Sequence, residues 1–469
     1  MRLKLMTLAL LLLASGISLA AETAAPDTLQ AAVPDSLQAA VPDSLQPPAS
    51  EINNGLMALD MAVLTIGVWL PSRLLGTDWA YIGFNTVKEN MKTGFVWDHD
   101  SWGMNQWGHP LHGGQFFNAA RTNGYDFWGS IPITIAGSMT WELFMEAEPP
   151  SINDLISTTV GGVYMGETSY RLSSMILDNT ATGSERTFRE IGAFFVNPIR
   201  GFNRLVTGQS GKVGLNPDDW RPSYLGGHLS AGTNHVADGT DLSNSMPAYL
   251  LKGKFLYGDP FEDLADPEPF DYFTIRAALT LHGRFPFIHE VTGTGLLYGR
   301  KFDHGQDNRH LFGIFHDYDY FDSQVYQFGG QSIGGGIFSR FNSQSPMQIL
   351  TGAQLNWVIL GGSNVGFETS HGREYNYTTG AKFKMFGMLD HRKYGSFAIR
   401  YWIYWFHTVS GVDGDEFIHW AQATLNPRIY KKWGVGLDFT YYLRNSYFDD
   451  LPETHLKNIE LRTFVSYRF

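Results

Sequence analysis

From about residue 220 to the end of the chain, apolar and polar residues alternate with a period of two, which is the period of an extended strand. The closing segment shows the pattern most clearly. One face of that strand carries Ile459, Leu461, Thr463, Val465, Tyr467 and Phe469. The other face carries Glu460, Arg462, Ser466 and Arg468, with Phe464 as the exception. An apolar face opposite a charged face is typical of a strand between lipid and a wet lumen.

Similar segments recur along this half of the chain, separated by clusters of turn residues. We expect strands at 223–233, 247–257, 270–283, 288–302, 307–320, 324–341, 345–360, 373–388, 394–408, 416–427, 431–445 and 457–469. An even number of strands fits a single-chain barrel with both ends on the same side. The pattern therefore predicts an antiparallel transmembrane β-barrel of about 12 strands over residues 220–469. The chain stops at Phe469, and such a terminal aromatic resembles the signal that outer-membrane barrels present to the barrel assembly machinery.

Between about residues 50 and 210 the pattern changes to that of helices. The segment Leu56 to Leu70 is nearly all apolar, carries Asp60 and stops before Pro71. Fifteen residues are too few to cross a bilayer, so we expect a buried or membrane-interface helix. The fold class is therefore α+β, with a helical module at 50–210 followed by the barrel.

The first residues have the features of a secretory signal. A short basic start precedes an apolar run from Leu8 to Leu13, and Ser18-Leu19-Ala20 is a small-x-small cleavage site. We place a signal peptide at residues 1–20. Together with the barrel, it predicts the outer membrane of a Gram-negative cell, with the helical module on the periplasmic side and outer-membrane lipid around the barrel.

Residues 21–49 contain an eight-residue repeat with proline at positions 26, 34 and 42. Such a segment cannot bury enough apolar surface to fold alone. We expect a disordered spacer. The alternative is a docking motif built on its leucines, through which a periplasmic partner would bind.

Composition narrows the possible functions. The formal charge of −12 argues against nucleic acid as a partner, because nucleic-acid-binding faces are basic. Aromatic residues make up 14% and charged residues 17% of the chain, which suits aromatic girdles and an apolar wall. With no cysteine, disulfides and thiolate metal sites are excluded, and we predict no cofactor.

The helical module carries a dense set of polar residues. We expect one helix from Pro110 to Arg121, because proline fits the first turn. A second helix should begin near Ser130 and place Glu142 and Glu146, four residues apart, on one face. Two carboxylates on an apolar helix repel each other unless they are paired, bind a cation, or one stays protonated.

A third helix should begin at Ser151, with Asp154 completing a capping box. It carries a stripe of small residues, Thr158, Gly162 and Gly166, which would let a neighbouring helix approach closely. The same segment holds Glu167 and Arg171, spaced as an i, i+4 ion pair.

Two interpretations of these polar residues remain open. In the functional one, His109, Glu142, Glu146 and Asp154 form a catalytic acid/base site in one cleft. Substrate would be bound by His112, Arg121, Glu167 and Arg171. In the structural one, His109 is a helix cap or a satisfied histidine, and the two glutamates pair with Arg121 and Arg171. Histidines spaced i, i+3 are a weak zinc signal without further ligands, so we predict no metal site.

These residues also carry a resemblance to a known family. The string comprises His109-Pro110, Gly113, Arg121, Gly124, Trp141-Glu142, Glu146, Pro150-Ser151, Asn153-Asp154, Gly161-Gly162, Gly166-Glu167 and Arg171. Over roughly residues 85–190 it resembles the bacterial family called domain of unknown function 3943. This resemblance implies an envelope protein with a barrel-like C-terminal part, without an established activity. A looser likeness to VanZ-like membrane proteins implies a shared helical core.

Three functions are compatible with this pattern. The first is an enzyme that processes an envelope lipid or glycolipid at the His/Glu/Asp site. The second is a channel or transport barrel with a helical periplasmic plug. The third is a structural factor for envelope assembly.

Overall fold

The computed structural model describes residues 51–469 except 263, 265, 266, 282–285, 306, 324, 367–372 and 450. The predicted signal peptide and spacer lie outside these residues. The chain forms two compact units. Residues up to Val96 and Gly108–Leu225 make a helical unit, whereas Trp97–Trp107 and Gly226–Phe469 make a barrel unit. Residues 97–107 therefore group with the barrel although their sequence lies within the helical module.

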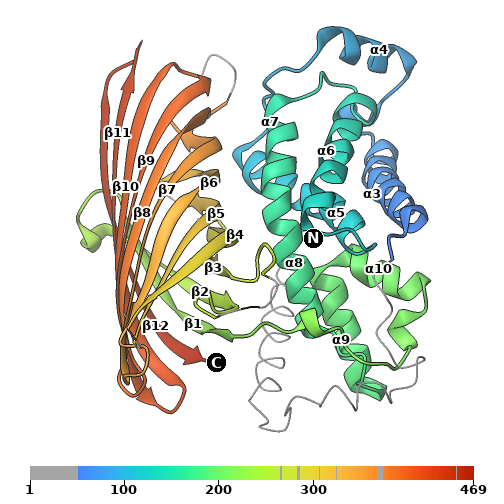
Figure 1. Ribbon diagram of the computed structural model, residues 1–469. Helices are drawn as coiled ribbons and strands as arrows, with labels where there is room; N and C mark the ends of the chain where they lie inside the picture. Colours follow the sequence, from blue (N-terminus) through green and yellow to red (C-terminus); the bar gives the residue numbers. More distant parts are fainter. Residues whose placement is uncertain are drawn as a thin grey trace. The chain divides into compact units, whose positions relative to one another are not determined.

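The barrel is a closed antiparallel sheet of twelve strands, which confirms the predicted fold class (Figure 1). The strands are β1 Leu225–Ala237, β2 Met246–Tyr257, β3 Phe273–Leu281, β4 Ile288–His304, β5 Asn308–Asp322, β6 Gln327–Phe341, β7 Met347–Asn364, β8 Tyr375–His391, β9 Gly395–Ser410, β10 Gly414–Tyr430, β11 Trp433–Phe448 and β12 Thr454–Arg468. Each strand pairs with the next along the chain. The last strand closes the barrel against the first, with His228 opposite Arg468 and Ala237 opposite Ile459.

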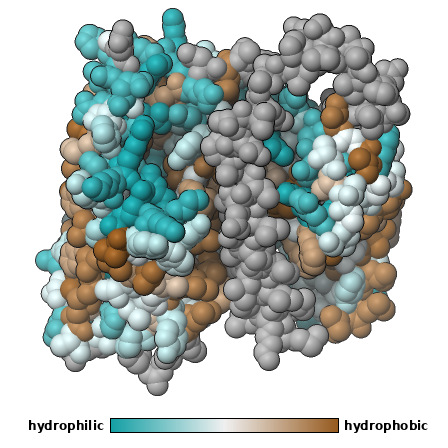
Figure 2. Space-filling model, turned by 90° about the horizontal axis from the view of Figure 1, so that it is seen from below, coloured by the Kyte–Doolittle hydropathy of each residue, from teal (hydrophilic) through white to brown (hydrophobic). Residues whose placement is uncertain are grey.

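Contacts between strands that are not neighbours identify the lumen, because in a closed sheet such side chains meet only inside. Lys252 on β2 binds Asp438 on β11 at 2.6 Å, and Lys382 on β8 binds Asp317 on β5 at 2.8 Å. Phe464, the exception in the closing strand, also faces inward, with the Lys252 ammonium 3.6 Å from the centre of its ring. The outward residues of β7 to β12 are largely apolar and exposed. In Figure 2, hydrophobic residues lie along the flank of the barrel and hydrophilic residues gather at the end seen from below.

A cluster of mostly aromatic side chains, called the aromatic layer below, lies inside the lumen. Its fully or nearly fully buried members are Phe321, Tyr326, Phe328, Val358, Trp402, Tyr404, Phe406, Ile418, Trp420 and Tyr442. The rings stack closely, since the centroids of Phe321 and Phe328 are 4.7 Å apart and those of Tyr326 and Tyr442 are 4.5 Å apart. Stacked and edge-on rings at these distances attract one another beyond their area burial.

Residues 97–107 lie on the outer wall of the barrel. The Trp102 ring centroid is 6.1 Å from that of Tyr320 on β5 and 5.7 Å from that of Tyr375 on β8. Tyr320 alternates along its strand with Asp319, which faces the lumen, so Trp102 covers the opposite face. This short segment thus belongs to the packing of the barrel itself.

The helical unit contains α3 Asn54–Leu74, α4 Phe84–Thr93, α5 His109–Arg121, α6 Phe127–Phe144, α7 Ile152–Ile156, α8 Gly162–Ile176, α9 Gly183–Val196 and α10 Pro198–Val206. The predicted end of the first helix at Pro71 was wrong. That proline lies inside α3, and the helix closes beyond it with Leu75 N donating to Pro71 O. At 21 residues α3 is long and apolar enough to cross a membrane, and most of it is exposed, with Asp60 its one buried residue.

The predicted close approach of a helix to the small-residue stripe is confirmed, but its partner is α5. A Cβ built on Gly113 of α5 would lie 1.7 Å from the Thr158 carbonyl oxygen, and one on Gly162 would lie 2.7 Å from the Gly113 Cα. A Cβ on Gly166 would meet the Phe117 ring. The glycines bring the backbones of α5 and α8 together, as small residues do between tightly packed helices.

Candidate functional site

His109 and Asp154 form the centre of the predicted site. His109 is the first residue of α5, which Pro110 allows because a first-turn proline forfeits no helix hydrogen bond. Its Nε2 lies 3.0 Å from Asp154 Oδ1, which also accepts a hydrogen bond from Asn153 Nδ2 at 2.8 Å. The structure therefore brings two of the four predicted catalytic residues into direct contact. An imidazole held by a carboxylate can take up and release a proton.

Glu142 lies near this pair, in the last turn of α6. Its Oε2 accepts a hydrogen bond from the backbone nitrogen of Ser151 at 2.8 Å. Burial, followed by the charges of Asp154 and Glu146, raises the pKa of Glu142 to about 9. The carboxyl is consequently neutral at pH 7 and is able to donate a hydrogen bond.

The same contact replaces the predicted capping box at the third helix. Ser151 occupies the N-cap of α7, but its side chain makes no cap hydrogen bond there. Its backbone nitrogen binds Glu142 instead, and Asp154 binds His109. The capping-box interpretation of Ser151 and Asp154 was therefore wrong, because the Ser151 backbone nitrogen and the Asp154 carboxylate each bind a residue distant in sequence.

The expectation that Glu142 and Glu146 share one helical face was also wrong. The helix begins at Phe127 with Asp126 as its cap, three residues before the predicted start, and it ends at Phe144. Glu146 lies beyond that end, where its Oε1 accepts a hydrogen bond from the Trp141 indole at 2.6 Å. The two carboxylates are still electrostatic neighbours, since Glu146 contributes to the raised pKa of Glu142.

His112 lies one turn after His109 but has a different environment. Its ring centroid is 4.4 Å from that of Phe116 and 4.8 Å from that of Trp141. Burial, followed by the charge of His109, lowers the pKa of His112 to about 3. A neutral ring among aromatic side chains fits packing, and its role in substrate binding remains a prediction.

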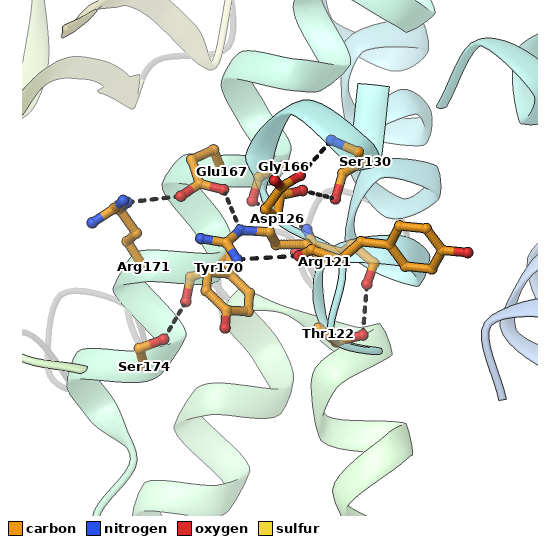
Figure 3. Close-up of polar contacts among 12 residues, drawn as sticks. Arg121, Thr122, Asp126, Ser130, Gly166, Glu167, Tyr170, Arg171 and Ser174 are labelled. Atoms are coloured by element: carbon orange, nitrogen blue, oxygen red, sulfur yellow. Dashed lines mark hydrogen bonds and ion pairs between the residues drawn. The ribbon is translucent and has the colours of Figure 1, made fainter. Parts of the chain in front are cut away.

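Arg121 and Arg171 form a second polar centre, around Glu167 (Figure 3). Arg121 Nε donates to Glu167 Oε2 at 3.0 Å, and Arg171 Nε donates to Glu167 Oε1 at 2.7 Å. Burial alone would raise the pKa of Glu167, but the two guanidinium groups outweigh it and hold the pKa below its usual value. The i, i+4 pair of Glu167 and Arg171 is thus confirmed. Both arginines bind Glu167, so the proposed pairing of Glu142 and Glu146 with them was wrong.

A third arginine, Arg200, lies next to this centre across the Tyr170 ring. The Tyr170 ring lies between the guanidinium carbons of Arg121 and Arg200, each 4.5 Å from its centroid. Arg200 also donates to Tyr170 O and to the Ser173 and Ser174 hydroxyls. The Arg200 guanidinium is thus held by three partners on α8.

A third set of charges lies in the barrel lumen, which sequence reasoning did not identify as a site. Lys382 binds Asp317 and Asp319, while Arg462 binds Glu290 and Glu460 at 2.9 Å each. The sequence did show that the closing strand carries charged residues, since Glu460 and Arg462 alternate with apolar residues there. Their partners lie on strands far away in sequence, and only closure of the barrel reveals them.

The fold and these sites define a closed twelve-strand antiparallel barrel of outer-membrane type joined to a helical unit with two buried polar centres. Residues 94–199 match the family model described as Domain of unknown function (DUF3943), which supports the predicted family over the helical unit. The likeness to VanZ-like proteins remains a prediction.

Among solved structures, the chain is similar to several barrels at low identity. The NanC porin is 8% identical over 51% of this chain and 98% of its own, with a TM-score of 0.30. The outer membrane channel DcaP of Acinetobacter baumannii is 9% identical over 52% and 96%, with a TM-score of 0.24. An anion-selective porin from Comamonas acidovorans is 8% identical over 52% and 99%, with a TM-score of 0.22. No curated protein matches this chain in sequence.

Proposed function

We propose that this protein is an outer-membrane barrel of the channel type, whose hydrated lumen passes small hydrophilic solutes and is closed by the aromatic layer in the conformation described above. The observation that carries the proposal is the meeting of charged side chains from non-neighbouring strands inside a closed barrel with an apolar, exposed wall. Charges so placed need a wet interior, because an ion in a dry one loses its hydration.

The outer wall supports a membrane location. Its exposed apolar side chains include Leu355, Trp357, Met385, Ile399, Trp405, Leu425, Val435, Leu437 and Val465. A wall of this kind on a sheet without edges fits hydrocarbon, where every backbone polar group must be paired. The chain enters β1 at Leu225 and leaves β12 at Arg468, at one end of the barrel. That end is therefore proposed as periplasmic, with the helical unit on the same side.

Unpaired amides support a hydrated lumen. Asn234 lies opposite Arg462 in the sheet and Gln354 lies opposite Lys384, so both face inward. Both side chains are buried, and in the part of the chain that the structure describes neither amide has a hydrogen-bond partner. Buried amides without protein partners are usually satisfied by water.

Removing one member of the aromatic layer tests the proposal. Trp420→Ala should raise the conductance of purified protein in planar bilayers, because it deletes the largest buried ring of the layer. Trp405→Ala is the matched control, since Trp405 is 43% exposed on the outer wall and its loss should leave the conductance unchanged. Phe406→Ala, in the same layer, serves as a second variant.

Heat-modifiable migration on unboiled gels shows which variants are folded barrels. The channel proposal is overturned if Trp420→Ala or Phe406→Ala folds and still conducts no more than the native protein. Equal increases in Trp420→Ala and Trp405→Ala would contradict closure by the aromatic layer and would instead indicate a leak at the barrel wall.

Lipid processing at the helical unit is the weaker hypothesis. The contact between His109 and Asp154 fits a proton-holding pair, and it fits a structural ion pair equally well. None of the comparisons supports an enzymatic activity. The function in envelope assembly likewise remains a prediction.

A further inference from the structure

Two cationic side chains in the lumen differ from the other charged residues there. Lys254 lies on β2 and Arg400 lies on β9. In the described part of the chain, neither has a carboxylate oxygen within the 4.0 Å of an ion pair. Nearby lumen cations are paired, since Lys252 binds Asp438 at 2.6 Å and Arg468 binds Asp390 at 2.7 and 2.9 Å.

The sheet register places both groups inside the barrel and close to a third cation. Lys254 lies opposite Arg276 on β3. Arg276 reaches across the lumen, where its Nη2 donates to Gln422 Oε1 on β10 at 2.8 Å. Arg400 lies opposite that same glutamine and donates to its Oε1 at 3.4 Å and to Thr424 Oγ1 at 3.1 Å. Two cations therefore share Gln422, and the third, Lys254, lies opposite one of them in the sheet.

The carboxylates of this region do not balance these cations. Glu290 lies 3.5 Å from Arg276 but is bound more closely by Arg462, at 2.9 Å. Asp390 acts on Lys254 only at longer range. Arg400 is repelled by Arg276, and the two carboxylates that attract it from a distance, Asp438 and Glu290, are already bound by Lys252 and Arg462. In addition, one buried guanidinium nitrogen of Arg276, Nη1, makes no hydrogen bond within the described residues.

Like charges held together inside a barrel are unfavourable unless a negative group joins them. Guanidinium forks and ammonium groups are the side chains that bind carboxylate and phosphate oxygens best. We infer that Lys254, Arg276 and Arg400 form a binding site for a small soluble oxyanion, a carboxylate- or phosphate-bearing solute. The selectivity of the passage for such solutes rests on the proposed channel function, whereas binding itself does not.

Binding is tested first with full-length protein in detergent, with inorganic phosphate and then citrate as probes at constant ionic strength. We expect saturable thermal stabilisation by at least one of them. Lys254→Gln and Arg400→Gln should weaken that binding at least tenfold. Both variants should fold, because neither replacement breaks an ion pair. Lys457→Gln, at an exposed lysine of β12, is the matched control and should bind as the native protein does.

The inference is overturned if neither probe binds, or if Lys254→Gln and Arg400→Gln bind them as tightly as the control. It is also overturned if the protein responds only to added phosphatidylglycerol and not to phosphate or citrate. That last outcome would assign the cations to a lipid headgroup instead of a soluble anion.

Bilayer recordings under a salt gradient separate this inference from the channel proposal. If the protein conducts, the reversal potential should indicate a preference for chloride, and Arg400→Glu should shift it toward potassium. If no variant conducts, the channel proposal fails while the detergent measurements still decide whether the anion site exists. Anion binding combined with an unchanged reversal potential in Arg400→Glu would contradict the role of this site in selectivity.

Discussion

The barrel lumen and the Glu142 region of the helical unit bury carboxyl groups in opposite ways. In the lumen, most ionised groups have an opposite charge within 3 Å, as Lys382 has in Asp317 and Asp319. In the helical unit, Glu142 lies among other carboxyl groups and remains protonated, with its pKa raised to about 9. A closed sheet can supply partners from any strand around the lumen. Within the helical unit Glu167 also has cationic partners, in Arg121 and Arg171, whereas the charges nearest to Glu142 are those of Asp154 and Glu146, and protonation removes its own charge.

The largest loss of stability is expected on replacing Lys382. Its Nζ lies 2.8 Å from Asp317 and 2.5 Å from Asp319, with all three side chains almost wholly buried. Lys382→Met should destabilise the barrel by about 3–5 kcal/mol, because removing one partner of a buried pair leaves an uncompensated charge. The shift is measured as the urea midpoint of heat-modifiable migration.

Two further variants separate charge from packing at this position. Lys382→Met combined with Asp319→Asn should recover part of the lost stability, since the unpaired carboxylate is then neutral. Lys457→Met, at an exposed lysine, should change the midpoint little. A fully stable Lys382→Met barrel would mean that the lumen is wet enough to hydrate free carboxylates.

A smaller effect is expected where α5 and α8 meet. Gly113→Ala would place a Cβ within van der Waals overlap of the Thr158 carbonyl, so the two helices must separate. We expect a loss of about 1–3 kcal/mol, as overpacked cores show, measured by thermal melts followed through tryptophan fluorescence. Gly67→Ala in α3 is the matched control. Nothing lies within 4 Å of its Cβ, so the change should be neutral or stabilise by up to about 1 kcal/mol. Equal effects of the two substitutions would contradict the close helix contact.

The last prediction concerns Glu142 and is a change in how stability depends on pH. The folded-state pKa of about 9 exceeds the ordinary value of 4.5, so between these values the folded protein binds more protons than the unfolded chain. The stabilising contribution is complete below pH 4.5 and is lost as pH rises toward 9, by about 1.4 kcal/mol per unit.

Glu142→Gln should therefore flatten the decrease of melting temperature between pH 5 and 9, with the smallest difference from the native protein at the acidic end of that range. The amide oxygen can still accept the hydrogen bond from Ser151. Glu148→Gln, at an exposed carboxylate, should leave the slope as it is in the native protein. If the slope is unchanged in Glu142→Gln as well, the carboxyl is ionised in the folded state and the contrast with the lumen disappears.

The two regions also differed in how much their sequence predicted. All twelve strands were predicted, because alternation with a period of two is a local property that a sheet with one apolar face requires at every position. In the helical unit, the helix from Pro110 to Arg121 was predicted within one residue, since its proline and the following Gly124 mark its limits. The starts and ends at Ser130 and Pro71 were wrong, because Asp126 offered an earlier cap and a late proline did not stop α3.

The sequence by itself therefore determined the elements, the barrel and the presence of a polar centre in the helical unit. Only the tertiary structure decided which charges meet. Asp154 bound His109 in place of its own helix cap, and both arginines bound Glu167 in place of Glu142 and Glu146. Six strands, β3 to β8, separate the lumen cations Lys254 and Arg400 in the sequence, yet closure of the sheet places both beside Arg276. A pattern along the chain fixes which face a side chain occupies, whereas its partner depends on contacts between distant segments, which no local periodicity records.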